Sequence, residues 1–255
     1  MRRASVLAGL GVALLVLPLV GLVQRAPWSA VAAELGSPAA REALRLSLVC
    51  SAGALAVSLV LGVPLAWVLA RVDFPGRSLV RALVTLPMVL PPVVGGVALL
   101  AVFGRAGLLG SWLGAAPGFP LPFTTQGVVL AQAFVAMPFL VLATEAGLRQ
   151  MDRRYEEAAA TLGARPWLRF RSVTVPLIAP SLAAGAALCW ARALGEFGAT
   201  VTFAGSFPGR TRTLPTAIYA GLQTDPEGAV ALSLVLLAVS LAVLVALRGR
   251  WLQPG

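Results

Sequence analysis

Hydrophobic residues fill long segments of this chain, and short segments rich in arginine, glycine and proline separate them. Six hydrophobic segments are long enough to cross a bilayer as a helix, which takes about 20 residues. They run from about residue 4 to 23, 44 to 69, 79 to 103, 128 to 148, 177 to 201 and 229 to 247. Continuous apolar runs of this length are typical of membrane helices. The pattern therefore predicts an all-α integral membrane protein with six transmembrane helices.

The composition supports a membrane protein and excludes several other classes. Of the 255 residues, 58% are hydrophobic and 12% are charged, whereas about 25% are charged in a typical soluble domain. The net charge of +10 comes from arginine alone, since the chain has no lysine. No basic cluster interleaved with aromatic residues is present, which argues against nucleic-acid binding. Without lysine the chain cannot contain a Walker A phosphate loop, so any ATP hydrolysis must occur in another subunit.

Residue types that hold metals or cofactors are scarce. The chain has no histidine, and Cys50 and Cys189 lie far apart inside apolar segments. This arrangement predicts neither a zinc site nor a disulfide framework, and both cysteines are expected to be small buried residues. We therefore expect the chain itself to bind no metal and no cofactor.

The first apolar segment has two interpretations. Its basic start, its apolar core and the small residues at 30–32 fit a cleaved signal peptide. The apolar run is longer than a usual signal core, however, and a polar segment that begins at Arg25 separates it from that cleavage site. We favour a retained first transmembrane helix over residues 1–24, followed by one transmembrane core over residues 25–255.

The third apolar segment contains prolines that disturb a straight helix. Pro87, Pro91 and Pro92 lie within residues 79–103, and each removes a backbone donor and favours a bend. At membrane depth such backbone is tolerated where protein or a water-lined path satisfies its polar groups. One interpretation is a broken helix beside a polar pathway, with Pro91 and Pro92 at the break. The other is a kinked helix that neighbouring helices pack against.

Residues 152–176 form the longest polar interruption, and their sequence indicates two short helices. Asp152 can accept hydrogen bonds from the free N–H groups of a first turn. Gly163 suits the left-handed residue that ends a helix, and Pro166 suits the first turn of the next one. Pro176 then marks the start of the fifth apolar segment. A helix-turn-helix between two spans is suited to hold a partner protein, and the alternative is an amphipathic loop on the membrane surface.

The distribution of arginine predicts which side of the membrane this segment faces. If the N-terminus is cytoplasmic, the cytoplasmic segments contain Arg2, Arg3, Arg71, Arg77, Arg81, Arg149, Arg153, Arg154, Arg165, Arg169, Arg171, Arg248 and Arg250. The external segments then contain only Arg25, Arg41, Arg45, Arg105, Arg210 and Arg212. Positive charge is enriched in cytoplasmic loops. We therefore expect both termini and residues 152–176 to lie in the cytoplasm.

The fifth apolar segment carries two charges, which are costly inside a membrane and mark functional candidates. Arg192 and Glu196 are four residues apart, so they share one face of a helix and can pair. Gly195 and Gly198 permit close helix contact or a local break, and Thr200 follows them. These residues indicate either a structural ion pair or the lining of an anion pathway, because the arginine fork matches an oxyanion.

Arg210 and Arg212 lie in the external loop that follows this segment. At an external mouth they could attract an anion or meet acidic groups on a docked protein. The alternative is a pair of solvated charges beside a glycine turn.

Residues 152–176 resemble the EAA loop of ABC importer permeases. The match consists of Glu157-Ala158-Ala159, Gly163 and Val173-x-Val175-Pro176, with the spacing EAA-x3-G-x9-[IV]-x-[LV]-P. In that family the loop is the cytoplasmic coupling element, and it docks into a groove on the ATP-hydrolysing subunit. The resemblance implies a coupling role for Glu156, Glu157, Ala158, Ala159, Gly163 and Pro176.

A second resemblance concerns the cargo. ARALGEFGATVTFAG at 191–205, the segment 208–215, FPGR at 74–77 and LPMVLPPVVGG at 86–96 resemble the molybdate permease subunit of ABC importers. Sulfate permeases share the LGEFG core. The likeness covers most of residues 40–250, although Val173 and Val175 replace the commoner Ile and Leu.

The resemblance implies a type I ABC importer permease for molybdate or tungstate in a prokaryotic cell membrane, where the chain is a non-catalytic subunit. It implies a homodimer, two ATP-binding subunits that use the ATP, and an extracytoplasmic binding protein. The nearest alternative is the same machine carrying sulfate or thiosulfate. A second alternative is an ion-gradient-driven carrier, but such carriers usually have more intramembrane acidic residues than the single Glu196 found here. A membrane enzyme would need a catalytic constellation that this chain lacks.

Overall fold

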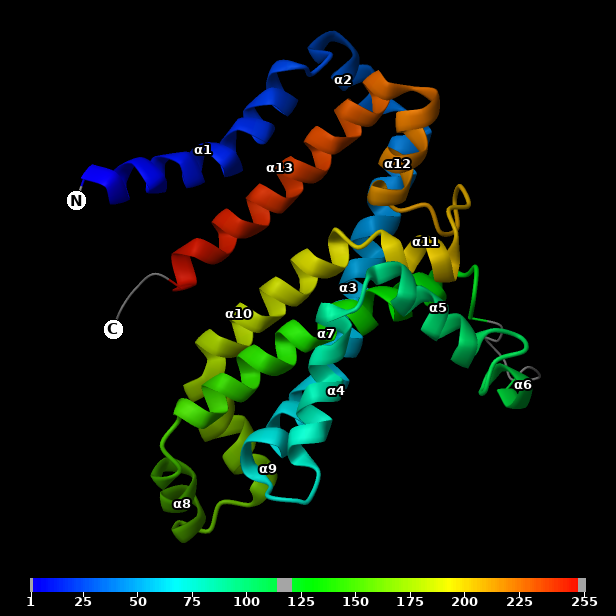
Figure 1. Ribbon diagram of the computed structural model, residues 1–255. Coiled ribbons are helices and arrows are strands. Elements are labelled where there is room, and N and C mark those ends of the chain that lie inside the picture. Colours follow the sequence, from blue (N-terminus) through cyan, green and yellow to red (C-terminus); the bar gives the residue numbers. More distant parts are fainter. Residues whose placement is uncertain (1, 114–120, 252–255) are drawn as a thin grey trace.

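The computed structural model describes residues 2–113 and 121–251, and the regular structure in these ranges is helical throughout (Figure 1). The elements are α1 (Arg2–Gln24), α2 (Trp28–Gly36), α3 (Pro38–Arg71), α4 (Arg77–Val89), α5 (Pro92–Phe103), α6 (Gly110–Leu113), α7 (Thr125–Gln150), α8 (Arg154–Thr161), α9 (Pro166–Arg169), the π-helical turn η1 (Phe170–Thr174), α10 (Val175–Leu194), α11 (Gly198–Ala204), α12 (Leu214–Thr224) and α13 (Pro226–Trp251). The all-α prediction is confirmed.

Among the described residues, five helical segments are long and apolar enough to cross a membrane: α1, α3, α7, the continuous helix from Pro166 to Leu194, and α13. The helices α4 and α5 pass the same test only as a pair, and their axes differ by 118° across a break at Leu90 and Pro91. Counted as one broken span, this pair gives the six spans that the sequence predicts. The third span is therefore broken rather than merely kinked.

The fifth span differs from the prediction at both ends. α9 continues through η1 into α10, so the helix begins at Pro166 and the second short helix is not separate from the span. The wider π-helical turn ends at Thr174, two residues before Pro176, whose ring would clash with the carbonyl of a regular preceding turn. The helix ends at Leu194, and a new helix begins at Gly198. The predicted continuous span over residues 177–201 is therefore wrong.

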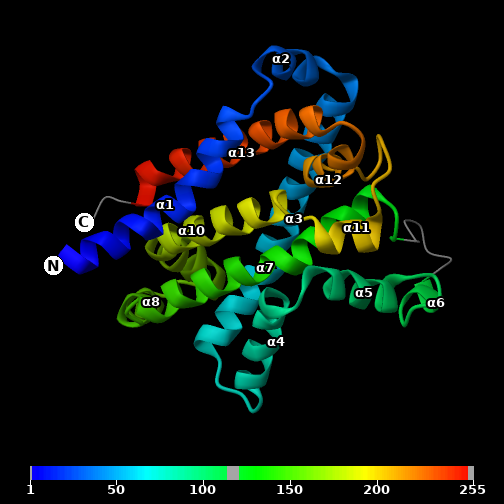
Figure 2. The same cartoon turned by 45° about the horizontal axis from the view of Figure 1, so that its top comes forward.

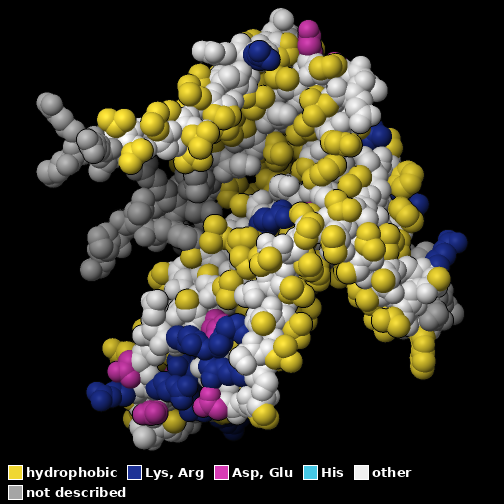
Figure 3. All heavy atoms as spheres, viewed as in Figure 1, with side chains coloured by type: hydrophobic (Ala, Val, Ile, Leu, Met, Phe, Trp, Pro, Cys, Tyr) yellow, Lys and Arg dark blue, Asp and Glu magenta, His cyan; other side chains and the backbone are white. Residues whose placement is uncertain are grey.

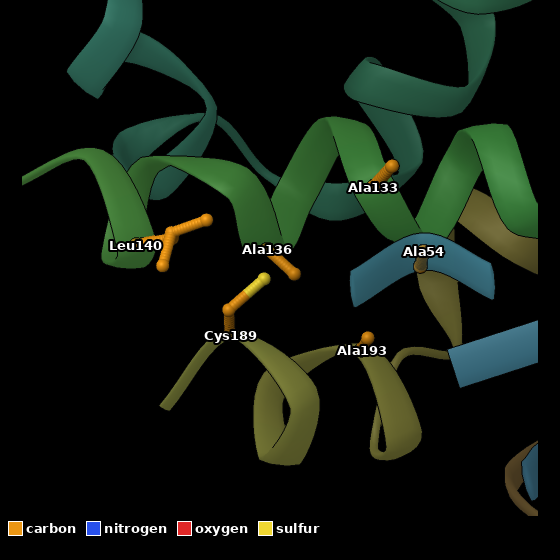
Figure 4. Close-up of a cluster of buried hydrophobic side chains, with 6 residues drawn as sticks. All are labelled: Ala54, Ala133, Ala136, Leu140, Cys189 and Ala193. Atoms are coloured by element: carbon orange, nitrogen blue, oxygen red, sulfur yellow. The ribbon is translucent and has the colours of Figure 1, made fainter. Parts of the chain in front are cut away.

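The centre of the molecule consists of α3, α7 and α10, which pack through small side chains. One buried cluster contains Ala54, Ala133, Ala136, Leu140, Cys189 and Ala193 (Figure 4). Cys50 is also buried, as predicted for both cysteines. Small residues let membrane helices approach closely. At Gly185, for example, an added Cβ would lie 2.8 Å from the Cβ of Ala143. The candidate residues on these helices are thus fixed to a tightly packed centre.

The terminal helices lie at the periphery of this centre. α12 and α13 pack against the beginning of α3, in a buried cluster that includes Leu214 and Leu232. The apolar side chains of α1 point outward, and Leu14 and Leu15 are 75% and 73% exposed. The N-terminal end of α1 and the last turn of α13 lie at the same end of the molecule (Figures 1 and 2). Such apolar exposure is expected of helices that face lipid or another subunit.

Candidate functional site

Charged side chains gather at one end of the molecule, around α8 and α9 (Figure 3). The turn between these helices has the predicted chemistry, because Gly163 has a φ of +80° and Pro166 begins α9. The carboxylate of Asp152 accepts a hydrogen bond from the backbone N–H of Arg154 at 2.9 Å. Arg154 is the first residue of α8, so Asp152 caps the helix from two residues upstream. A helix-turn-helix therefore projects from this end.

The surface of this helix-turn-helix is apolar as well as charged. Its large exposed apolar side chains are Tyr155 (58%), Leu162 (88%), Trp167 (70%) and Leu168 (53%). Sequence reasoning missed these residues, although large apolar side chains within a polar loop were a usable signal. Exposed apolar groups rimmed by charges are typical of surfaces that bind another protein.

The predicted coupling residues fall into two groups. Glu157, Ala158, Gly163 and Pro176 are exposed, and Ala159 is half-buried. Glu156 instead makes contacts within the chain. One carboxylate oxygen lies 3.3 Å from Nη2 of Arg71, at the end of α3, and the other accepts a hydrogen bond from the Thr174 hydroxyl at 2.7 Å.

A second carboxylate joins α4 to α7 near the same end. Glu145 is 4% exposed, and its Oε1 atom lies 2.6 Å from Nη2 of Arg81 and 2.9 Å from Nη2 of Arg149. None of the α4 side chains is fully buried. The ion pair between Glu145 and Arg81 therefore helps to hold α4 in place. Sequence spacing alone could not predict this pair, because its two residues lie far apart along the chain.

The breaks in the third and fifth spans lie next to each other, where Gly198 is buried and Pro92 is exposed. α5 begins at Pro92, and α11 begins at Gly198. A Cβ added to Gly198 would lie 2.7 Å from the Cβ of Pro92, so a side chain there would force the two helix starts apart. Gly195 directly follows α10 and occupies its C-cap. The structure thus brings together Pro91, Pro92, Gly195 and Gly198, which sequence analysis selected from two separate spans.

Arg192 and Glu196 form the ion pair that their spacing in the sequence permits. Nη2 of Arg192 lies 2.5 Å from Oε2 of Glu196, and the two side chains are 30% and 1% exposed. Glu196 lies in the break, where its Oε1 also accepts the backbone N–H of Ala199 at 2.8 Å. It therefore caps α11 as well as pairing with α10. Thr200 is buried, and its hydroxyl has no hydrogen-bond partner among the described residues.

The predicted external arginines have different surroundings. Arg210 lines an open cavity of about 640 Å³, together with Phe123 and with Arg105, which sequence analysis did not select for this region. Arg212 instead turns back to Ser206, donating to its carbonyl at 3.3 Å and to its hydroxyl at 3.4 Å. The lining residues lie near the end of α5, just before α7 and in the segment after α11. The helices α5 and α11 lie away from α8 (Figures 1 and 2). Within the described ranges, no group of three or more Cys, Asp or Glu residues could hold a metal ion.

Residues 62–255 match the family described as "Binding-protein-dependent transport system inner membrane component". The chain belongs to this family. The matched residues include the break between α4 and α5, the helix-turn-helix, the Arg192–Glu196 pair and the cavity lined by Arg105 and Arg210. As a member of the family, the chain is an inner membrane component of a transport system. Its candidate functional regions are the charged end at α8 and α9 and the breaks beside Pro92 and Gly198.

The chain is also similar in sequence to permeases whose names state the substance that they transport. The molybdenum transport system permease protein ModB of Mycobacterium tuberculosis is 47% identical over 240 residues, which cover 94% of this chain and 90% of the relative. ModB of Escherichia coli is 42% identical over 211 residues, 83% of this chain and 92% of the relative. The sulfate transport system permease protein CysT of Escherichia coli is 37% identical over 239 residues, 92% of this chain and 86% of the relative. The predicted resemblance to molybdate and sulfate permeases is confirmed.

Solved structures show the same fold for this permease. A bacterial ABC transporter involved in the import of the acidic polysaccharide alginate gives a TM-score of 0.74 at 19% identity, covering 97% of this chain and 93% of that chain. An inward-facing structure of the MetNI methionine ABC transporter gives 0.56 at 19% identity, with 83% and 94% coverage. These likenesses show that the chain has the same fold as a component of each of these transporters.

Proposed function

We propose that this chain is the membrane permease of an ATP-driven importer of molybdate. The observation that carries the proposal is the 47% identity to a molybdenum permease over 94% of the chain. Sulfate, a tetrahedral dianion of similar shape, is the second candidate, because a sulfate permease is 37% identical over a similar length. Tungstate, another tetrahedral dianion of similar shape, is grouped with molybdate in the first candidate function.

The helix-turn-helix of α8 and α9 is the docking element for an ATP-binding subunit. Its exposed side chains Leu162 and Trp167 offer apolar anchors, and Glu157 and the neighbouring arginines form a charged rim. A hydrophobic centre with a polar rim is the usual anatomy of a protein interface. The arginine distribution supports a cytoplasmic location for this end and for both termini.

The membrane path lies between two copies of the chain. A single copy leaves much apolar surface on its spans uncovered, for example Leu188 on α10 and Val93 and Val97 on α5. A homodimer would bring two broken-helix centres together and present two docking elements to a pair of ATP-binding subunits. Closure of those subunits would then move the docking elements and alternate access to the path, without covalent chemistry by the permease.

The external cavity is the region where the anion arrives from an extracytoplasmic binding protein. Arg105 and Arg210 both line it and place positive charge at its wall. A cleft lined by one sign of charge raises the local concentration of the opposite ion. This charge suits an oxyanion and also an acidic surface on the delivering protein.

Uptake into proteoliposomes tests the function. The vesicles would contain this chain and its ATP-binding subunit, with the binding protein outside and labelled molybdate or labelled sulfate as cargo. We expect ATP-dependent molybdate uptake that a large excess of sulfate barely reduces. Preferential sulfate uptake would show that the chain belongs to an ATP-driven importer of sulfate instead of molybdate. Uptake that does not depend on ATP would refute the ATP-driven mechanism.

A matched pair of tryptophan variants tests the docking element. Trp167→Gln removes an apolar anchor from the helix-turn-helix, and Trp112→Gln removes a tryptophan of similar exposure (87% against 70%) from the other end of the molecule. We expect Trp167→Gln alone to weaken co-purification of the ATP-binding subunit. Equal co-purification with both variants would argue against docking at α8 and α9.

A further inference from the structure

Glu156 connects three elements that are separate along the chain. It lies in the first turn of α8, next to Arg71 at the end of α3 and Thr174 in η1. Its two carboxylate oxygens are divided between these partners: Oε2 faces the Arg71 guanidinium, and Oε1 accepts the Thr174 hydrogen bond. One side chain therefore ties the docking element to the ends of two spans.

The burial of the partners shows that these contacts are not surface pairings. Thr174 is 1% exposed, and the Arg71 side chain is 8% exposed. Within the described ranges, Glu156 is the carboxylate that forms an ion pair with Arg71, and the buried Nε of Arg71 has no hydrogen-bond partner there. A charge this buried depends on its partner far more than an exposed one does.

The neighbouring residue has the opposite arrangement. Successive residues on an α-helix point about 100° apart, so Glu156 and Glu157 cannot face the same way. Glu156 points back into the permease, and Glu157 is exposed on the surface of α8. The two adjacent acids therefore have different tasks, although they have the same chemistry.

We propose that Glu156 is a positioning residue that transmits movement of the docking element to α3 and α10. Arg71 is the last residue of α3, and Thr174 directly precedes α10. These helices pack on α7 at the centre of the molecule, so a displacement of α8 reaches that centre through Glu156. This inference rests on the proposed docking function, and it assigns Glu156 to internal transmission rather than to contact with the ATP-binding subunit.

The test compares the molybdate transported per ATP hydrolysed in proteoliposomes that contain the complete complex. Glu156→Gln and Arg71→Gln each remove one charge of the pair, and Arg71→Glu combined with Glu156→Arg restores it with reversed polarity. Thr174→Val removes the second contact with almost no change in side-chain volume. Asp73→Asn is the matched control, because it removes the exposed Asp73–Arg77 ion pair just beyond α3, which does not involve α8.

We expect each single-charge variant to lower transport per ATP by about fivefold or more, in the range of a typical coupling energy between sites. The reversed pair restores the ion pair, but arginine at position 156 cannot accept a hydrogen bond from the Thr174 hydroxyl. Transport per ATP in the reversed pair should therefore rise to the level of Thr174→Val, which also lacks that hydrogen bond, and no higher. Asp73→Asn should match the wild type. In all variants the ATP-binding subunit should still co-purify, since the docking surface is intact.

Two results would overturn the inference. The first is normal transport per ATP in Glu156→Gln, and the second is a reversed pair that performs no better than the worse single variant. Monodisperse elution of each purified variant from a size-exclusion column would show that it is folded, so that a loss of transport per ATP reflects lost coupling. If a charge variant does not fold, Thr174→Val tests the same connection without changing a charge. A wild-type complex that fails to couple ATP to uptake would instead refute the proposed function itself.

Discussion

Removal of Arg192 should destabilise the permease more than removal of its partner. Arg192→Leu leaves the Glu196 carboxylate buried at 1% exposure, with the Ala199 N–H as its remaining hydrogen bond. Breaking a buried pair from one side costs about 3–5 kcal/mol. Because Arg192 is 30% exposed and Glu196 keeps one donor, we expect a cost below this range, about 2–3 kcal/mol.

The partner variant should cost less. Glu196→Gln keeps an oxygen that can accept the Ala199 N–H, and the partly exposed Arg192 can find other partners, so we expect about 1 kcal/mol. The double variant Arg192→Leu/Glu196→Gln buries no unpaired charge and should also lie within about 1 kcal/mol of the wild type. The predicted order of stability therefore places the double variant above Arg192→Leu.

Thermal unfolding of the purified chain in detergent measures this order. For a chain of this size a loss of 1 kcal/mol lowers Tm by about 2–4 °C. Arg192→Leu should then lower Tm by about 5–10 °C, and restoring neutrality at position 196 should recover most of that loss. A double variant that unfolds at or below the Tm of Arg192→Leu would show that the two side chains do not act as a pair.

Three further groups of variants test other parts of the structure. Gly163→Val should reduce ATP-driven uptake at normal folded yield, because a β-branched residue is strained at a φ of +80°, whereas Gly163→Asn should be tolerated. Gly185→Leu should lower Tm because α7 leaves no room for a Cβ, and Gly21→Leu, at a position with open space, is its control. Arg105→Gln with Arg210→Gln should slow uptake at limiting molybdate in low salt, and the difference should shrink as salt screens the charges.

Local chemistry explains the parts of this fold that sequence analysis predicts well. Gly163 and Pro166 specify their own backbone conformation, so the turn between α8 and α9 follows from those residues. The break near Pro91 follows from the missing N–H groups of consecutive prolines. Long apolar runs likewise identify the spans, since only length and hydropathy are needed.

The parts that sequence analysis misses depend on contacts between distant residues. The fifth span ends at Leu194 because Glu196 caps a new helix, a role that becomes visible only when its contact with Ala199 is known. Glu156 and Glu157 are indistinguishable until Arg71 is placed beside one of them. Arg105 joins Arg210 at one cavity only after two separate loops are brought together.

Two successive residues independently favour the bend between α4 and α5, so the bend is resistant to mutation. A residue before proline is disfavoured in the helical conformation, and this applies to Leu90 before Pro91 and to Pro91 before Pro92. Both residues have extended ψ angles, of 136° and 130°. Replacing Pro91 leaves position 91 restricted by Pro92, and replacing Pro92 leaves Leu90 restricted by Pro91. Substitution of either proline alone should therefore leave the bend in place.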